Sequence, residues 1–561
     1  MKGFLLFTVL TIFVALKSIG QTSEHYDYHP PLKIPLVLSS NFGELRPNHF
    51  HMGLDFKTNN KTGYNLYSIE EGYVSRIKVS TYGYGKVVYI DHPNGITSVY
   101  AHCEEFKGEI DSIVRLTQES EQNFEVEIFP GKNKIRVKKG QIIAISGNTG
   151  GSTAPHLHFE IRDTKTEHAL NPLLFGFRMA DTKAPEIRNL KAYGLTKEGY
   201  RIPGKEVSKA VSKAGANYII AGNKITVSSS FCTSSGGLGL AFDVIDRFDG
   251  ASNQCGLFGS YLIVDGDTIF GQKIERVPFE STRYVNSHKD YEAYQSSRNK
   301  YHKSFRTAEN DLPIYINGSL GLIKTSPGST HEVEYIAFDA NGNTSNLRFT
   351  LAVASGEITT EVWSDSKDYL FPQKTYGLTD GNCTIEMGYS TVYEPMAYKK
   401  SEVCSHIGDP ETPVNRAYKI KLKASEPHDG KHYVRMVTAK SSVKALEVTY
   451  EASWAIATSK YFGDFSLERD EKAPSVSSSG FANGSSISGS SLSWSISDSE
   501  SGIDDYDLFI DGKWYLLEYE YKTGKVTFTK PTNLKGKKAV KVIVKDACGN
   551  EKIWEGTLNF L

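Results

Sequence analysis

The residue types best suited to chemistry in this sequence are two histidines one residue apart, His156 and His158. They follow a glycine-rich stretch, residues 146–153, and belong to an alternating His-Leu-His-Phe segment. Alternation predicts a β-strand, because successive side chains of a strand point to opposite faces. The two imidazoles then share one face, while Leu157 and Phe159 point into a core. Two imidazoles held side by side can bind a metal ion, or can combine a metal ligand with a proton-transfer group.

Further ligands for such an ion occur earlier in the chain, in the segment His51-Met52-Gly53-Leu54-Asp55. A spacing of four places the imidazole and the carboxylate on one face of a predicted strand, with Gly53 leaving room between them. His51, Asp55 and His158 together offer two nitrogens and one carboxylate oxygen, which suits Zn²⁺ with water as its fourth ligand. Zinc lowers the pKa of bound water towards about 7, so hydroxide becomes available at neutral pH.

The elements that must position these residues are short strands separated by glycine turns. They recur between residues 34 and 177, for example at 72–79, 85–90 and 95–102, and no long amphipathic helix is visible among them. Short strands at this spacing are typical of an antiparallel sheet or barrel-like domain. We therefore expect one such domain over residues 30–178.

The sequence over residues 35–175 resembles the lysostaphin/LytM-type zinc endopeptidases. The resemblance rests on three motifs that occur in order: His51 with Asp55, then Tyr100-Ala101-His102, then Pro155-His156-Leu157-His158-Phe159-Glu160. Each motif alone is common, and their combination within one domain makes the resemblance specific.

The resemblance implies a reaction and a role for each residue. The implied zinc ligands are His51, Asp55 and His158, and the implied catalytic histidines are His102 and His156. The implied function is that of an exported zinc metalloendopeptidase, which hydrolyses peptide bonds in peptidoglycan stems or cross-bridges with a zinc-activated water. One imidazole can accept a proton from the water, and a protonated one can stabilise the oxyanion or protonate the leaving amine. The sequence does not divide these tasks between the two histidines.

One stretch departs from the family pattern. Residues 103–136 form a longer excursion than expected, and we predict an extra hairpin or lid over residues 104–129 beside the cleft. Cys103 follows His102 directly, so strand alternation places its thiol on the opposite face, as a buried structural group.

Internal repeats organise the remainder of the chain. Asp181-Thr182-Lys183-Ala184-Pro185 recurs as Asp470-Glu471-Lys472-Ala473-Pro474, and Asp339-Ala340-Asn341-Gly342-Asn343 recurs as Asp546-Ala547-Cys548-Gly549-Asn550. The repeats predict two immunoglobulin-like β-sandwich modules, over residues 186–354 and 472–561. The predicted fold class is therefore mainly β, with two or three such sandwich modules after the N-terminal sheet domain.

Two further stretches complete this prediction. Residues 356–470 alternate as a sandwich does but carry no repeat signature, so we expect a β-rich module there. Residues 277–312 are an insertion in the first sandwich, rich in Tyr, Arg and Lys, which we interpret as a solvated loop.

Bulk properties restrict the protein's location and partners. A chain of 561 residues needs several domains, and a net charge of -1 gives no argument for nucleic-acid binding. The basic start and short apolar core of residues 1–20 predict a secretory signal peptide, with no membrane span after its cleavage. The protein is then exported, to the periplasm, the cell envelope or the extracellular space.

Export permits disulfides. Of the six cysteines, Cys232 with Cys255 and Cys383 with Cys404 are near enough in sequence to pair, although sequence does not fix the connectivity.

Two other functions compete with the enzyme. A non-catalytic protein of the same fold could regulate another cell-wall hydrolase, but all five site positions are filled here, which favours activity. Alternatively, the chain could be an adhesion protein that uses the sandwich modules and residues 284–306 as a contact surface. The expected partners of the protein are the peptidoglycan peptide and, through the sandwich modules, a cell-envelope protein.

Overall fold

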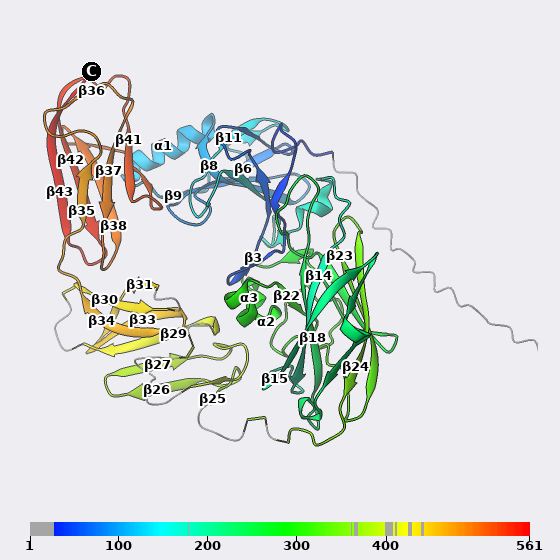
Figure 1. The fold of residues 1–561 in the computed structure, drawn as a ribbon. Helices are drawn as coiled ribbons and strands as arrows, with labels where there is room; N and C mark the ends of the chain where they lie inside the picture. The colour runs from blue at the N-terminus through cyan, green and yellow to red at the C-terminus, as the bar shows by residue number, and fades with distance from the viewer. Residues whose placement is uncertain are drawn as a thin grey trace, which may run out of the picture.

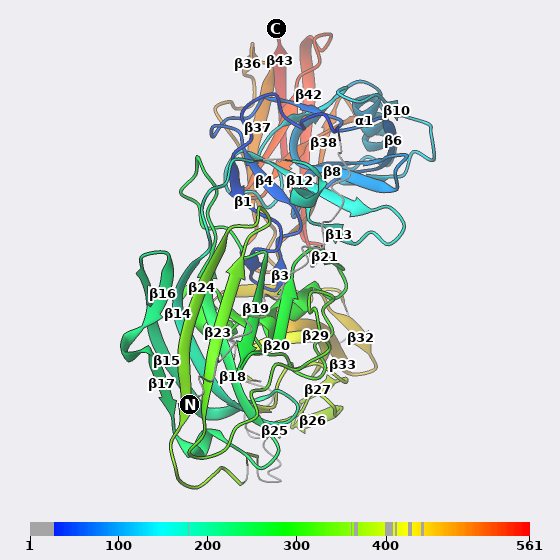
Figure 2. The ribbon, with the colours of Figure 1, turned by 90° about the vertical axis from the view of Figure 1, so that its right-hand side faces the viewer.

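The computed structural model describes residues 27–177, 179–360, 362–363, 369–398, 408–409, 412–424, 429–438 and 442–561. These residues form a mainly β fold, which confirms the predicted fold class (Figure 1; Figure 2). The predicted signal peptide lies outside the described residues. Within the described part, none of the helices combines the length and the apolarity needed to cross a membrane.

The N-terminal domain is built on a 12-stranded antiparallel sheet. Its main path runs in the order β1 (Leu38–Ser40), β4 (Leu54–Lys57), β12 (His156–Asp163), β8 (Ile96–Phe106), β7 (Lys86–Asp91), β6 (Gly72–Val79) and β10 (Arg136–Val137). The other strands are β5 (Asn65–Tyr67), β9 (Val126–Ile128), β11 (Ile142–Ser146), β13 (Ala169–Leu170) and β21 (Arg276–Val277). A separate hairpin pairs β2 (Leu45–Arg46) with β3 (His49–Phe50).

Strand β12 shows why this sequence forms a central strand. Leu157, Phe159 and Ile161 are fully buried in the hydrophobic core beneath the sheet, so their alternation with polar residues fixes the register. The intervening His156 and His158 therefore face away from the core, as the alternation predicts.

Two local predictions for this domain are wrong. Residues 104–129 form no extra hairpin: β8 continues to Phe106, and helix α1 (Glu109–Glu121) follows it. Helix α1 forms because Ile110, Val114 and Gln118 recur every fourth residue and are all buried on one helix face. His51 also lies outside a shared strand with Asp55, because it falls in the connection between β3 and β4.

The first module follows and contains a 10-stranded sheet around its own hydrophobic core. Its strands are β14 (Glu186–Leu195), β15 (Arg201–Ala214), β16 (Asn217–Ile220), β17 (Lys224–Val227), β18 (Gly237–Ile245), β19 (Gly259–Val264), β20 (Asp267–Lys273), β22 (Tyr301–Lys303), β23 (Thr330–Phe338) and β24 (Thr344–Val353).

The interpretation of residues 277–312 as a solvated loop is wrong. They contain helices α2 (Val285–His288) and α3 (Tyr291–Ser297), and all five residues from Asn286 to Asp290 are at most 2% exposed. Strand β21 adds to the N-terminal sheet through β13, and the side chains of Val285 and Tyr294 join the N-terminal hydrophobic core. This burial also leaves little of α2 free to act as the adhesive contact surface of the alternative hypothesis.

The middle module and the last module are both built from paired sheets. The middle module contains β25 (Tyr369–Leu370), β26 (Tyr376–Asp380), β27 (Cys383–Met387), β28 (Met396–Ala397), β29 (Pro413–Lys423), β30 (His432–Val437), β31 (Val443–Leu446), β32 (Thr449–Glu451), β33 (Trp454–Tyr461) and β34 (Asp464–Arg469). The last module contains β35 (Ser475–Ser478), β36 (Ser486–Ile487), β37 (Ser491–Ser497), β38 (Ile503–Ile510), β39 (Lys513–Tyr515), β40 (Glu518–Glu520), β41 (Lys525–Thr529), β42 (Gly536–Asp546) and β43 (Glu551–Phe560).

The four parts contact one another in a closed ring, in which the last module returns to stand beside the N-terminal domain (Figure 1). Lys303 of the first module pairs with Glu394 of the middle module at 3.0 Å. Lys431 of the middle module donates to the carbonyl oxygen of Cys548 at 2.9 Å. The ring closes where Lys86 of the N-terminal domain pairs with Glu518 of the last module at 2.6 Å.

One of the two predicted cysteine pairings is wrong. Cys232 and Cys255 are free and buried, so they do not pair with each other. Cys383 is disulfide-bonded, and its predicted partner, Cys404, lies outside the described residues. Cys103 is a free, fully buried thiol in the core, as alternation predicts.

Candidate metal centre

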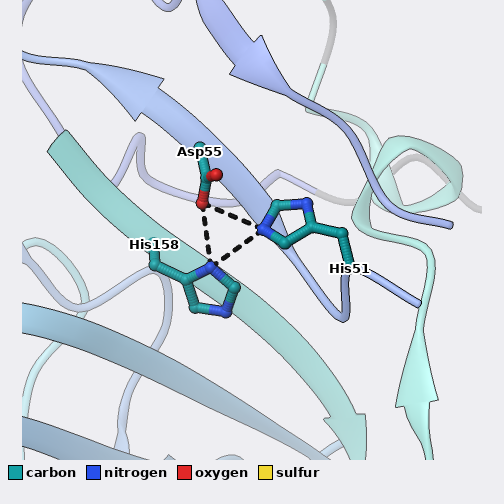
Figure 3. A group of neighbouring side chains, drawn as sticks. All are labelled: His51, Asp55 and His158. Carbon is teal, nitrogen blue, oxygen red and sulfur yellow. Dashed lines mark hydrogen bonds and ion pairs between the residues drawn. The ribbon is translucent and has the colours of Figure 1, made fainter. Parts of the chain in front are cut away.

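Three side chains bring one potential ligand atom each to a common point (Figure 3). His51 Nε2 lies 3.0 Å from Asp55 Oδ1 and 3.1 Å from His158 Nδ1. His158 Nδ1 lies 2.9 Å from Asp55 Oδ1. All three residues are buried, at 5 to 8% exposure.

Pairing between strands positions two of these ligands. Asp55 of β4 is directly opposite His158 of β12, and directly opposed residues of an antiparallel pair have neighbouring side chains. His51 reaches the same point because the connection before β4 passes very close to β12. A Cβ atom on Gly53 would lie 2.4 Å from the carbonyl oxygen of Phe159, so this approach requires glycine.

Hydrogen bonds to the outer nitrogens fix the orientation of both ligand imidazoles. His51 donates its Nδ1 proton to the carbonyl oxygen of Asn41 at 2.8 Å, and His158 Nε2 contacts the Glu160 carboxylate at 2.9 Å. When both imidazoles are neutral, their single protons lie on His51 Nδ1 and His158 Nε2, so that His51 Nε2 and His158 Nδ1 present lone pairs to each other and to Asp55 Oδ1. Three lone-pair atoms facing one another fit a bound cation, and outer hydrogen bonds of this kind accompany histidine ligation of zinc.

The charges around the centre shift its pKa values strongly. Burial tends to raise the pKa of Asp55, but the neighbouring imidazoles, His51 first among them, hold it well below its usual range. Burial tends to lower the pKa of His158, but its hydrogen bonds to Asp55 and Glu160 raise it to about 9. Burial also tends to raise the pKa of Glu160, which the Arg162 guanidinium and His158 lower to about 2.

His102 and His156 stand beside the three ligands, with their ring centroids 4.9 Å apart. His102 donates its Nδ1 proton to the carbonyl oxygen of Thr149 at 2.8 Å, and His156 donates its own to that of Ala154 at 2.8 Å. Each imidazole therefore has Nε2 free of a proton in its neutral form. His156 Nε2 lies 3.4 Å from Asp55 Oδ1. Burial, and then the neighbouring His158 and His156, lower the pKa of His102 to about 3.

A β-bulge turns His102 towards the centre. Between the pairs Lys86–Cys103 and Val88–Tyr100, strand β8 has one residue more than β7. The extra residue is accommodated by His102, whose φ is 59°. Tyr100 and Cys103 remain in the core while Ala101 and His102 both face outward. Bulges of this kind redirect side chains next to functional sites.

A cavity of about 880 Å³ adjoins the centre. Tyr84 connects the two, because its hydroxyl donates to Glu160 and its ring lies 5.4 Å from the His158 ring. The charged and aromatic residues lining the cavity include Arg76, Lys78, Tyr82, Tyr84, Tyr89, Arg162, Lys165, Glu167, Phe279 and Glu280. Phe279 follows β21, so the first module contributes part of the cavity wall.

The structure thus brings together all five residues that the sequence analysis singled out. It adds Glu160, Tyr84 and Arg162, which sequence reasoning did not assign to the site. Alternation along β12 could have indicated Glu160 and Arg162, since they share a face with His156 and His158. Tyr84 carries no comparable signal in the sequence.

Other modules also contact the surroundings of the centre. Asn41, which orients His51, exchanges two side-chain hydrogen bonds with the backbone of Gly256 in the first module, at 2.7 and 2.8 Å. Lys522 of the last module donates to the carbonyl oxygens of Asn148 and Ser152 in the glycine-rich loop, at 2.6 and 3.1 Å.

Comparisons with known proteins identify the class of this domain. Residues 49–119 and 126–172 match the model of Peptidase family M23. The N-terminal domain is thus similar to peptidase family M23, the LytM-type family that the sequence resembles, and the match spans less than half of the chain.

Individual relatives support this assignment. An uncharacterized metalloprotease of Haemophilus influenzae is 32% identical over 131 residues, covering 23% of this chain and 21% of the relative. The DD-carboxypeptidase/endopeptidase Mpg of Neisseria meningitidis serogroup B is 31% identical over 136 residues, covering 23% and 25%. The chain thus spans a quarter or less of the length of these relatives.

Solved structures give similar matches over the same region. The catalytic domain of the antimicrobial peptidase lysostaphin from Staphylococcus simulans has 25% identity and a TM-score of 0.18, covering 28% of this chain and 97% of that one. The catalytic domain of the M23 protein EnpA from Enterococcus faecalis has 25% identity and a TM-score of 0.19, covering 26% and 95%. Because these TM-scores are low, the assignment rests on the family match and the curated relatives.

Proposed function

We propose that this protein is an exported zinc metalloendopeptidase that hydrolyses peptide bonds in the stems or cross-bridges of peptidoglycan. One observation carries the proposal: three lone-pair atoms, from His51, Asp55 and His158, converge beside two imidazoles that each present Nε2. Relatives named as a metalloprotease and as a DD-carboxypeptidase/endopeptidase support the same chemistry.

In the proposed reaction, His51, Asp55 and His158 hold the zinc ion. When bound, zinc polarises the scissile carbonyl and activates a water molecule. The chain's own residues supply the proton transfers. Nε2 of one of the two imidazoles, His102 or His156, accepts a proton from the attacking water, and a protonated imidazole delivers a proton to the leaving amine. The backbone carbonyls of Thr149 and Ala154 hold both rings in the required tautomer.

The cavity beside Tyr84 is the proposed binding region for the peptide. The charged residues of its lining have both signs and include Arg76, Lys78, Lys165, Glu167 and Glu280. Arg76 and Lys78 pair with Glu127. Lysine and arginine side chains of this kind can bind the carboxylates of a peptidoglycan stem peptide. Hydrolysis of a peptide fits a site that combines a metal centre with an adjacent cavity.

The ligand assignment is tested by metal content. Purified full-length protein is expected to contain about one zinc per chain, and His51→Ala or Asp55→Ala to lose it, as measured by elemental analysis. His49→Ala is the matched control, because His49 is exposed and donates to its neighbour Pro47. Full zinc occupancy in a His51→Ala, Asp55→Ala double variant would contradict the assignment.

The catalytic assignment is tested by digestion of purified peptidoglycan, with mass spectrometry of the products. His102→Ala and His156→Ala are expected to keep zinc and to lose about 10²- to 10⁴-fold in rate, the usual contribution of general acid–base catalysis. Unchanged turnover in either variant would remove that histidine from the reaction. Intact peptidoglycan after exposure to zinc-loaded wild-type protein would favour the regulatory alternative.

Export is the remaining part of the proposal, and it rests on the sequence of residues 1–20. The expected mature protein lacks these residues, which N-terminal sequencing of the protein from an envelope fraction would show. Recovery of the full-length chain from the cytoplasm would contradict export.

A further inference from the structure

A second group of potential metal ligands lies in the first module, away from the zinc centre. Asp181, Asp246 and Asp339 each place a carboxylate oxygen within 4.8 Å of the other two. Asp181 belongs to the segment that leads from the N-terminal domain into β14. Asp246 follows the end of β18, and Asp339 follows the end of β23.

Two oxygens of this cluster are buried without any hydrogen-bond partner. Asp246 is 1% exposed, and its Oδ1 has no partner. Asp181 Oδ2 is likewise buried and unpaired. Among the described residues, no lysine or arginine forms an ion pair with any of the three carboxylates; the nearby Lys183 pairs instead with Asp249, at 3.9 Å.

Such an arrangement is costly without a counter-charge, because buried carboxylates lose their hydration and repel one another. Burial, and then repulsion from Asp339, raise the pKa of Asp246 to about 8. Burial, together with repulsion from Asp339, raises the pKa of Asp181 to about 6.

The third carboxylate is held rigidly in place. Asp339 Oδ1 accepts hydrogen bonds from the backbone amides of Asn341 and Asn343, both at 2.9 Å. Its Oδ2 accepts from Asn343 Nδ2 at 2.7 Å. Carboxylates can use further lone pairs for a metal ion while they accept such bonds, so Asp339 is held in position before any ion arrives.

The repeat in the last module provides an internal comparison. Asp470, Asp498 and Asp546 form a similar cluster there. In that cluster Ser501 donates both its amide and its hydroxyl to Asp470 Oδ2, at 3.1 and 2.6 Å. No carboxylate oxygen of these three residues is both buried and unpaired. The unsatisfied oxygens are therefore particular to the first module.

We propose that Asp181, Asp246 and Asp339 bind a Ca²⁺ ion. Oxygen-only ligands favour a hard cation over zinc. Three carboxylates offer up to six oxygens, which matches the six to eight that Ca²⁺ takes, whereas Mg²⁺ usually keeps several waters and uses one or two carboxylates.

The bound ion would tie the linker to the ends of two strands of the first module. Asp246 is also linked by backbone hydrogen bonds to Cys255, at 2.8 and 3.0 Å. The next residue, Gly256, bonds Asn41, whose carbonyl oxygen orients His51. The Ca²⁺ site thus anchors the segment of the first module that supports the zinc centre.

Calcium titration of the zinc-loaded full-length protein tests the proposal. In calorimetry the wild type is expected to bind Ca²⁺ with a Kd of about 10⁻³ M or tighter, as extracellular calcium modules do, and Asp246→Asn to bind one ion fewer. Asp498→Asn is the matched control and is expected to retain the ion lost in Asp246→Asn. No binding by the wild type, or equal binding by Asp246→Asn, would overturn the proposal, as would loss of the ion in Asp498→Asn alone.

Thermal unfolding separates loss of the ion from misfolding. Without Ca²⁺, Asp246→Asn is expected to unfold at or above the wild-type temperature, because the substitution removes the free-energy cost of burying an ionisable carboxyl group. With Ca²⁺ the wild type is expected to gain stability, by mass action, while Asp246→Asn does not change. Equal gains in both proteins would count against the site.

Discussion

Glu160 connects His158, a proposed metal ligand, to the interior of the protein. It is completely buried and accepts hydrogen bonds from His158 Nε2, from the Tyr84 hydroxyl and from Arg162 Nε, the last at 2.6 Å. Through these contacts it sets both the tautomer and the ring orientation of His158. Glu160 is therefore a positioning residue for the metal centre.

We predict that Glu160→Gln lowers zinc affinity by about 10- to 100-fold, the usual effect of losing such a partner. The amide keeps the shape of the side chain but not its charge. Competition with a chromophoric chelator would measure the affinity, and Glu167→Gln, at an exposed residue of the cavity that adjoins the centre, is the control. A wild-type affinity in Glu160→Gln would show that His158 does not depend on this carboxylate.

Much of the residue-level site was predictable, because strand alternation and motif spacing are local properties of a sequence. His156 and His158 share a face for that reason alone. The outward turn of His102 was not predictable from alternation, since it depends on a bulge that appears only when β7 and β8 are paired. The contact of Asn41 with Gly256 was equally hidden, because it joins residues from two modules.

Among the elements, the close approach of the β3–β4 connection to β12 depends on Gly53. We predict that Gly53→Ala destabilises the protein by about 1–3 kcal/mol, the usual cost of overpacking, and lowers its zinc content, because a Cβ there meets the backbone of β12. Chemical unfolding and elemental analysis would measure the two effects. Gly318→Ala, where a Cβ meets nothing within 4 Å, is the control. Wild-type stability in Gly53→Ala would contradict the tight contact.

Helix α2 and strand β22 bury a pair of histidines that gives a pH dependence. His288 Nε2 lies 3.1 Å from His302 Nδ1, with Lys289, Lys300 and Lys303 nearby. Burial, followed by Lys300, lowers the pKa of His302 from 6.5 to about 3. Burial and then His302 lower the pKa of His288 well below its usual range. Below pH 6.5 the unfolded chain therefore binds protons that the folded chain does not, and stability falls as the pH falls.

We predict that one such histidine lowers the free energy of unfolding by about 1.4 kcal/mol when the pH falls from 7.5 to 5.5. His302→Gln should reduce the loss of unfolding free energy over this range by about that amount. Denaturant unfolding at both pH values would measure it, with His29→Gln, a half-buried histidine outside the pair, as the control. An unchanged pH dependence in His302→Gln would contradict the burial of neutral imidazoles.

Prediction of the elements succeeded where a pattern was long and regular, as in β6, β8 and β12. It failed at α1, although the four-residue spacing of Ile110, Val114 and Gln118 was present in the sequence. It also failed at residues 277–312, whose polar residues suggested solvent. Those polar groups are buried because they pair with the N-terminal domain, as Lys300 does with Glu44 at 2.9 Å. The pattern of residues along a sequence does not show partners that are so far apart in the chain.

At the scale of the whole molecule, the N-terminal domain and the first module share one hydrophobic core. Eight buried side chains of the first module belong to the N-terminal core, among them Phe248, Ile274, Val277, Val285 and Leu312. Fully burying one such side chain is worth about 1.5–3 kcal/mol. Together they are comparable to the whole stability of a domain, about 5–15 kcal/mol.

We therefore predict that a chain ending at residue 177 is unfolded or aggregates, whereas a chain ending at residue 354 folds cooperatively. Circular dichroism and size-exclusion chromatography of both truncations would measure this. A stable, monomeric, zinc-binding product from residues 27–177 would show that the shared core is dispensable.

The contact between the last module and the N-terminal domain determines when the metal centre is completed during synthesis of the chain. The glycine-rich loop that holds His102 leaves the ribosome well before Lys522, which bonds two carbonyl oxygens of that loop from 370 and 374 residues further along the chain. Domains generally fold in the order of their synthesis. The loop therefore gains the support of Lys522 only after the last module has folded, so a fully assembled centre marks a chain in which that module has been synthesised and folded.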